Sequence, residues 1–195
     1  MKLNPLLIIV IFQLTLLSCN TKDEISNERL NTFQMTINGE LWKPSVIDNK
    51  PCQETFRCDQ SAIGGKIYYT IKASKDPQST TNFESENVLM LQIMNVNDVG
   101  IFPISDTFGD FNSYFQFIKN ENNEQKIYMN DTLNSAKVEI LELMPIEEGG
   151  LIGIRGRFSG TLYNTINQND SIVIDNCDFT FKRINWYDLN QCSTD

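Results

Sequence analysis

The clearest alternation of apolar and polar side chains lies at residues 33–37, where Phe, Met and Ile alternate with Gln and Thr. This period of two is typical of a β-strand with one buried face. Asn38 and Gly39 follow directly, and they supply the two positive-φ positions that a type I′ turn requires. Leu41 and Trp42 then begin a second apolar run. The stretch therefore predicts a β-hairpin.

Further strand-length runs rich in β-branched and aromatic residues are separated by turn-rich clusters of Asn, Asp, Gly and Ser. No segment of helical length shows a 3.6-residue period. Residues 45–65 are polar and end in Gly-Gly, and we expect them to form a loop. Strands are expected at residues 66–73, 88–94, 101–104, 114–118, 126–129, 136–144, 151–163 and 171–182. The pattern predicts an all-β fold, an antiparallel β-sandwich or partly open barrel of about eight to ten strands.

Two of these runs predict finer features of the sheet. In residues 136–144 the alternation breaks at Leu141, which indicates a β-bulge or a change of face. In residues 152–162, Gly156 and Gly160 share a face with the apolar positions, so we expect a neighbouring backbone or aromatic ring to approach closely there. The side chains expected to be buried are Trp42, Phe158, Leu162, Phe179 and Phe181.

The N-terminus has a different pattern. A basic start at Met1-Lys2 leads into an apolar run that ends at Leu16-Leu17-Ser18-Cys19, which is the organisation of a secretory signal. A transmembrane anchor is the alternative, but it needs about 20 mostly apolar residues, and this run is shorter and interrupted by polar ones. The Leu-Leu-Ser-Cys ending resembles the lipobox of bacterial lipoproteins. The resemblance implies that Cys19 receives lipid and becomes the mature N-terminus.

The chain is thus expected to have three parts. They are a lipoprotein signal peptide at residues 1–18, a lipid anchor and flexible tether at residues 19–32, and a single all-β domain with a short C-terminal tail at residues 33–195. Within the tether, Lys22-Asp23-Glu24 resembles the short charged signal that directs Bacteroidetes lipoproteins to the cell surface. An ordinary solvated linker is the alternative. We expect a lipid-anchored protein of the outer membrane on the cell surface, with the periplasmic face as the alternative.

The first hairpin also carries a family resemblance. Residues 33–42 have the form F-x-x-x-x-N-G-x-x-W, which resembles the opening of the DUF6252-like group of uncharacterised Bacteroidetes lipoproteins. Residues 152–162 are similar to the group's I-x-G-x-F-x-G segment, and residues 171–181 to its final strand, where Cys177 replaces the usual Gly. The resemblance implies a fold, but it gives no information about a reaction, because the group has no assigned biochemistry.

Composition excludes several function classes. The chain has 195 residues, no histidine and a formal net charge of −9. Histidine-dependent triads, imidazole metal ligands and a histidine pH switch are therefore excluded. An acidic chain without a basic cluster also lacks the charge pattern of a nucleic-acid-binding protein. We predict no cofactor, no metal and no nucleic-acid partner, and membrane contact through the acyl chains on Cys19.

Four cysteines besides Cys19 remain, namely Cys52, Cys58, Cys177 and Cys192. Outside the cytoplasm an even number favours disulfides. We expect Cys52 to pair with Cys58, since both lie in one loop, and Cys177 with Cys192, since both lie in the C-terminal segment. Free thiols are one alternative. A four-thiolate metal site is the other, and it lacks the short C-x-x-C spacing of structural zinc sites.

One loop carries a candidate ligand site, made of Asp106, Phe108, Asp110, Phe111 and Tyr114. Aromatic rings stack on sugar faces, and carboxylates bind hydroxyl groups or calcium. The alternative is structural: the rings cap the core, and the Asp and Gly residues form turns. Both interpretations place this loop at the end of a strand.

Two function classes follow. The first is a non-catalytic binding or scaffold module of the outer membrane with a glycan or protein partner. It is favoured because the chain has no recognisable catalytic motif. The second is a carboxylate-dependent glycan hydrolase, or an accessory protein in glycan uptake, because two carboxylates suffice for glycoside hydrolysis. No particular pair of carboxylates is indicated, so no catalytic residue is predicted.

Overall fold

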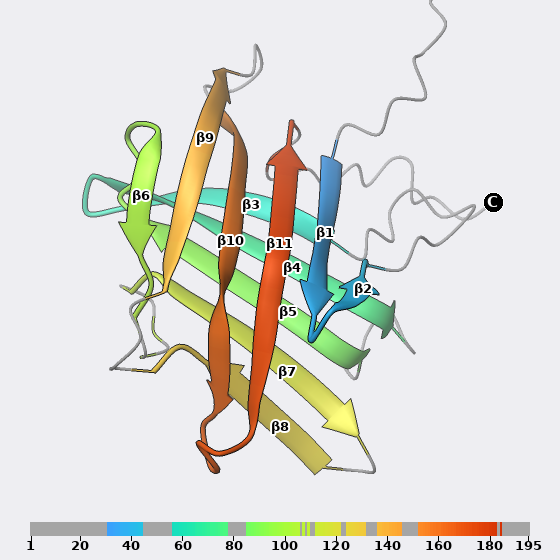
Figure 1. The fold of residues 1–195 in the computed structure, drawn as a ribbon. Helices are drawn as coiled ribbons and strands as arrows, with labels where there is room; N and C mark the ends of the chain where they lie inside the picture. The colour runs from blue at the N-terminus through green and yellow to red at the C-terminus, as the bar shows by residue number, and fades with distance from the viewer. Residues whose placement is uncertain are drawn as a thin grey trace, which may run out of the picture.

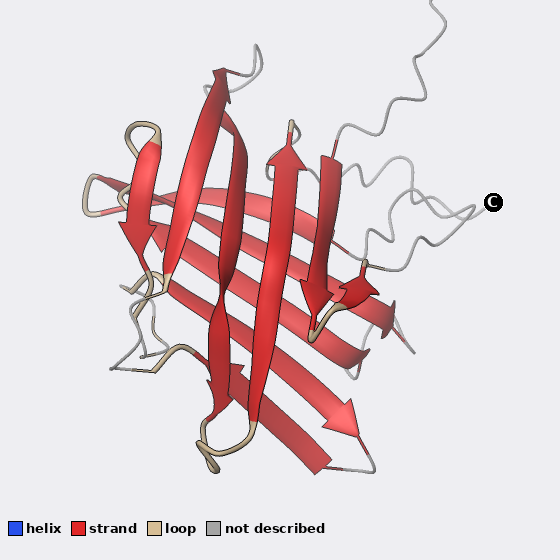
Figure 2. Cartoon of the chain, viewed as in Figure 1, coloured by secondary structure: helices blue, strands red, loops and turns tan. Residues whose placement is uncertain are grey.

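The computed structural model describes residues 31–44, 56–77, 85–105, 107, 109, 112–121, 124–131, 136–145, 152–182 and 184. In these ranges the chain consists of β-strands, turns and loops, and it contains no helix (Figure 2). It follows that the described part of the chain has no helix long and apolar enough to cross a membrane. The expected all-β fold class is confirmed.

Eleven strands are formed by the described residues. Their bounds are β1 Asn31–Ile37, β2 Glu40–Trp42, β3 Phe56–Ile63, β4 Lys66–Pro77, β5 Ser85–Met94, β6 Gly100–Pro103, β7 Tyr114–Glu121, β8 Glu124–Met129, β9 Lys137–Pro145, β10 Ile152–Asn164 and β11 Ser171–Phe181.

All strands belong to one antiparallel sheet that curls over itself as a half-barrel (Figure 1). The order is β2-β1-β11-β10-β8-β7-β5-β4-β3, with β9 added to β10 and β6 added to β9. In Figure 1 the strands β6, β9, β10, β11, β1 and β2 form a front layer, which crosses over a back layer of β3, β4, β5, β7 and β8. β10 joins the layers, because it pairs with β9 up to Ser159 and with β8 from Tyr163.

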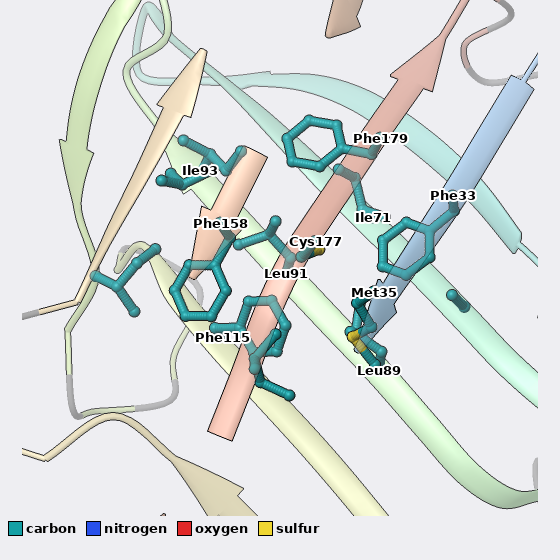
Figure 3. Close-up of a cluster of buried hydrophobic side chains, with 14 of the residues drawn as sticks. Phe33, Met35, Ile71, Leu89, Leu91, Ile93, Phe115, Phe158, Cys177 and Phe179 are labelled. Carbon is teal, nitrogen blue, oxygen red and sulfur yellow. The ribbon is translucent and has the colours of Figure 1, made fainter. Parts of the chain in front are cut away.

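The core lies between the two layers and is rich in aromatic rings (Figure 3). Phe115 of β7 and Phe158 of β10 stack across it with ring centroids 4.2 Å apart. Trp42 makes edge contacts with Phe33 and Phe117, so it also connects the layers. The five side chains expected to be buried, Trp42, Phe158, Leu162, Phe179 and Phe181, are all buried.

The first hairpin forms as expected. Asn38 and Gly39 have φ angles of 51° and 84°, which are the two positive values of a type I′ turn. The Asn38 backbone N–H donates to the Val173 carbonyl, and the Val173 N–H donates to Asn38 Oδ1, both at 2.8 Å. The turn is therefore held against β11 as well as closing its own hairpin.

Two β-bulges adjust which side chains reach the core. Arg155 pairs with Glu142 and Gly156 with Ile140, so Leu141 is the extra residue in β9, and the expected bulge is confirmed. A second bulge lies in β11, where Asn176 has a φ of 48°. Ile174 points inward before that bulge, and Cys177 points inward after it. A bulge shifts the alternation by one residue, so both halves of the strand contribute to the core.

The glycines of β10 face the core where space is short. A Cβ on Gly156 would lie 2.5 Å from the Phe179 ring and 2.7 Å from the Glu139 carbonyl oxygen. A Cβ on Gly160 would lie 3.2 Å from the Phe158 ring. The expected close approach is confirmed, and it is tightest at Gly156.

The prediction of a loop over residues 45–65 is wrong at its C-terminal end. Residues 56–63 form β3, and Gly64 and Gly65 form a hairpin turn with φ angles of 58° and 77°. The inward positions of β3 hold Cys58 and Gln60, which weakened the apolar alternation. Gln60 Oε1 accepts the Ile152 N–H at 2.9 Å, so a polar side chain at this position stabilises the contact between the layers. Tyr69 Oη donates to the Ile152 carbonyl, also at 2.9 Å.

Replacing Gly156→Ala is expected to destabilise the fold by about 1 to 3 kcal/mol, because the new methyl group overlaps a buried ring and a strand carbonyl. Gly160→Ala is the matched control, since its methyl group meets only a looser contact. Urea unfolding of both variants measures the difference. Equal losses in the two variants would contradict the packing argument.

Candidate functional site

The connection between β6 and β7 contains the loop that the sequence indicated. Its ends are drawn together, because the Ser105 N–H donates to the Ser113 carbonyl at 2.7 Å. Just before the loop, the Ile104 N–H donates to the Ala136 carbonyl at 2.9 Å. Within the loop the Asn112 N–H donates to the Gly109 carbonyl at 3.3 Å. The loop thus starts and ends beside strands of both layers.

Gln92 of β5 fixes the middle of this loop. Its Nε2 donates to the carbonyls of Asn112 at 2.8 Å and Gly109 at 3.1 Å. The Met94 N–H also donates to Ser113 Oγ at 2.9 Å. Gln92 alternates with the core residues of β5, so its side chain lies on the outer face of the back layer. The described part of the loop is therefore attached to the outside of the sheet.

Of the five residues of the candidate ligand site, the structure describes Tyr114. Tyr114 pairs with Gln92 across β5 and β7, and its side chain is only 3% exposed. A ring that stacks on a sugar must be open to solvent. In this structure the buried ring of Tyr114 is therefore not available to a sugar. Asp106, Phe108, Asp110 and Phe111 lie outside the described residues. Ligand binding by these four residues stays a prediction.

Cys58 and Cys177 are free thiols, both buried in the hydrophobic core. Burial raises the pKa of both thiols well above the usual value, and a neighbouring aspartate adds to the effect in each case. Cys52 and Cys192, with which they were expected to pair, lie outside the described residues, as does Cys19. The described part of the chain contains no disulfide.

The sequence did not reveal a polar cluster around Asp170, which lies just before β11. Its carboxylate accepts hydrogen bonds from Asn164 Nδ2 at 2.9 Å and Tyr128 Oη at 3.1 Å, and Lys126 Nζ lies 3.6 Å away. Asn164 lowers the pKa of Asp170 the most. Burial raises the pKa of Tyr128 to about 12. The cluster attaches the β10–β11 loop to β8.

In the sequence, the only sign of this cluster is the run of Asn and Asp residues between β10 and β11, and such runs are common in turns. The partners Tyr128 and Asn164 come together because β8 pairs with the end of β10. That pairing is long-range, and no local pattern indicates it.

A protein-family model matches residues 30–182 of the chain, a span that contains all eleven described strands. The chain belongs to the DUF5025 family, whose members share a domain of unknown function. The expected DUF6252-like membership is not confirmed, although an uncharacterised family was correctly expected. No curated protein and no solved structure matches the DUF5025 chain.

Five acidic side chains of the described residues lie within 4 Å of a Lys or Arg nitrogen: Asp59, Glu121, Glu139, Glu142 and Asp170. On the outer face of the front layer, Glu139 contacts Arg157 at 2.7 Å and Glu142 contacts Arg155 at 3.9 Å. Asp170 has the lowered pKa of a carboxyl held ionised, whereas a general acid needs a raised one. Within the described ranges, no three Cys, Asp or Glu side chains gather as a metal site would require.

Acidification should weaken the DUF5025 fold through Asp170. Its folded pKa is lowered from 3.8, so its stabilising effect is complete above that pH and is lost as the pH falls through the folded value. We expect Asp170→Asn to be less stable than wild type at pH 7, with the difference shrinking on acidification. Tyr128→Phe removes one of the donors, so it should keep part of this pH dependence. Parallel unfolding curves at every pH would contradict this role of Asp170.

The two buried thiols should be unreactive in the native protein. A variant with Cys19, Cys52 and Cys192 changed to Ser retains only Cys58 and Cys177. Ellman's reagent at pH 8 should modify neither thiol before unfolding and both afterwards, because the thiolate is the reactive form and burial opposes it. Non-reducing peptide mapping of the unaltered chain tests the expected disulfides. Rapid native modification would show that the thiols are accessible.

Proposed function

We propose that this DUF5025 chain is a lipid-anchored module of the outer membrane that is displayed on the cell surface and binds a partner without catalysis. The observation that carries the proposal is the apolar run ending in Leu16-Leu17-Ser18-Cys19. Such an ending marks the attachment of acyl chains, and stable anchoring by acylation takes more than one chain or signal. The folded sheet begins soon afterwards at Asn31, so the domain is held near the membrane.

The loop between β6 and β7 is the proposed contact surface. Gln92, Ser113 and Ser105 fix its described backbone on the outside of the back layer. The backbone that these bonds fix loses little conformational entropy when a partner binds, which favours affinity. The sequence places Phe108 and Phe111 in this loop close to Asp106 and Asp110, a combination suited to a glycan or to a polar protein surface.

Cys19→Ser is expected to abolish incorporation of labelled fatty acid and to release the protein from the membrane fraction. Proteinase added to intact cells should remove the wild-type domain, because the proposal places the domain outside. A Cys19→Ser protein that still carries label would disprove the anchor. A wild-type domain that resists proteinase until the outer membrane is opened would place it on the periplasmic face.

A glycan array with the purified protein tests the loop. Phe111→Ala should reduce binding about fivefold or more without changing the melting temperature, because an aromatic ring that stacks on a planar ligand such as a base contributes about 1 to 3 kcal/mol. Tyr114 is unsuitable for this test, since its ring is buried. Ser159→Ala, on the exposed face of β10, is the control. Cleavage of an arrayed glycan that a single Asp or Glu substitution abolishes would replace this proposal with the hydrolase.

A further inference from the structure

Two glutamine side chains on the outer face of the back layer donate to methionine sulfurs. Gln92 and Met94 are two residues apart on β5, so both lie on the face opposite to the core. Gln92 Nε2 is 3.9 Å from Met94 Sδ. Gln116 of β7 and Met129 of β8 are directly paired, and Gln116 Nε2 is also 3.9 Å from Met129 Sδ. The same contact therefore occurs twice, in different surroundings.

The two methionines differ in their exposure to solvent. Met94 is partly exposed, whereas Met129 is only 6% exposed. Of the other described methionines, Met35 is buried, and Met90 and Met144 are partly exposed. Oxidation of a side chain by a dissolved oxidant follows its exposure. Met94 is therefore the accessible member of the two glutamine–methionine pairs.

The two pairs also differ in what else the glutamine binds. Gln92 Nε2 donates to the carbonyls of Asn112 at 2.8 Å and Gly109 at 3.1 Å, so it attaches the loop between β6 and β7. A primary amide has two hydrogens, so the Met94 sulfur shares one of them with a carbonyl. The Gly109 carbonyl also accepts the Asn112 N–H at 3.3 Å. Because this carbonyl keeps a donor when Gln92 withdraws, its bond to Gln92 is the easier one to exchange.

We propose that Met94 is an oxidation site, and that its sulfoxide loosens the β6–β7 loop by taking the Gln92 hydrogen that the Gly109 carbonyl accepts. The oxidant is a peroxide. Its O–O bond breaks, one oxygen forms a bond to the sulfur, the sulfur is oxidised by two electrons, and hydrogen peroxide leaves as water. A sulfoxide oxygen is a polar acceptor, whereas a thioether sulfur is a weak one. The consequence for binding rests on the function proposed above, because this loop is the proposed contact surface.

Treatment of the full chain with hydrogen peroxide, followed by peptide mapping over time, tests the oxidation site. We expect Met94 to gain one oxygen atom roughly tenfold faster than Met129, because the two sulfurs have the same amide contact and differ in exposure. Fully buried Met35 is a second slow reference. Equal oxidation rates at Met94 and Met129, or a slower rate at Met94, would overturn the proposal.

Amide hydrogen exchange before and after peroxide treatment measures the attachment of the loop. In a variant with Met90→Leu and Met144→Leu, Met94 is the one partly exposed methionine left among the described residues. The N–H groups of Ser105 and Asn112, which are bonded within the loop, should exchange about fivefold faster after oxidation. Methionine sulfoxide reductases should restore the slow exchange. Unchanged exchange in protein oxidised at Met94 would contradict the proposal, and this result is independent of whether the loop binds a partner.

Two further variants in the same background test the role of the Gln92 amide. Met94→Leu has no sulfur, so peroxide should leave the exchange of its loop unchanged. Gln92→Glu removes both amide hydrogens with little change of shape, so its loop should exchange faster before treatment and show no further rise afterwards. Melting curves check that both variants fold. A peroxide effect that persists in Met94→Leu, or a further rise in Gln92→Glu, would show that the loop is loosened by another route and would overturn the proposal.

Discussion

The curl of this sheet depends on one strand that belongs to both layers. β10 pairs with β9 as far as Ser159 and then with β8 from Tyr163. The strand must turn between these two pairings, and Gly160 lies in that interval, where the Phe158 ring would be 3.2 Å from a Cβ. Phe158 itself stacks on Phe115 of the back layer. Covalent continuity and one aromatic stack therefore join the layers at the same place.

The rest of the closure comes from polar contacts at the two ends of β10. At its start, the backbone of Ile152 is bonded by Gln60 and Tyr69 of the back layer. At its end, Asn164 belongs to the Asp170 cluster, which reaches β8 through Tyr128. Polar groups inside a fold stabilise it only when they are paired, and these are. Trp42 Nε1 is the exception, since within the described residues it is buried without a partner.

Local patterns predicted most of the strands. They failed where the contacts that stabilise a strand come from residues far away in the sequence. The Asn38-Gly39 hairpin, the Leu141 bulge and the close packing at Gly156 all followed from local chemistry. β3 was missed because its inward Gln60 is polar, and the partner that makes this position favourable, Ile152, is far away in the sequence. The candidate loop was found from its composition, but the burial of Tyr114 follows from its place on the sheet, which composition does not contain.

The two outer faces of the half-barrel differ in a way that bears on partner choice. The front layer presents cross-strand pairs of opposite charge, such as Arg157 with Glu139, and paired charges at a surface contribute little to stability but repel apolar partners. The back layer presents four half-buried apolar side chains, Val88, Met90, Ile118 and Ile127, and a hydrogen-bonded loop. Two faces of such different chemistry therefore suit partners of different chemistry, because a charged surface opposes an apolar partner and an apolar surface does not.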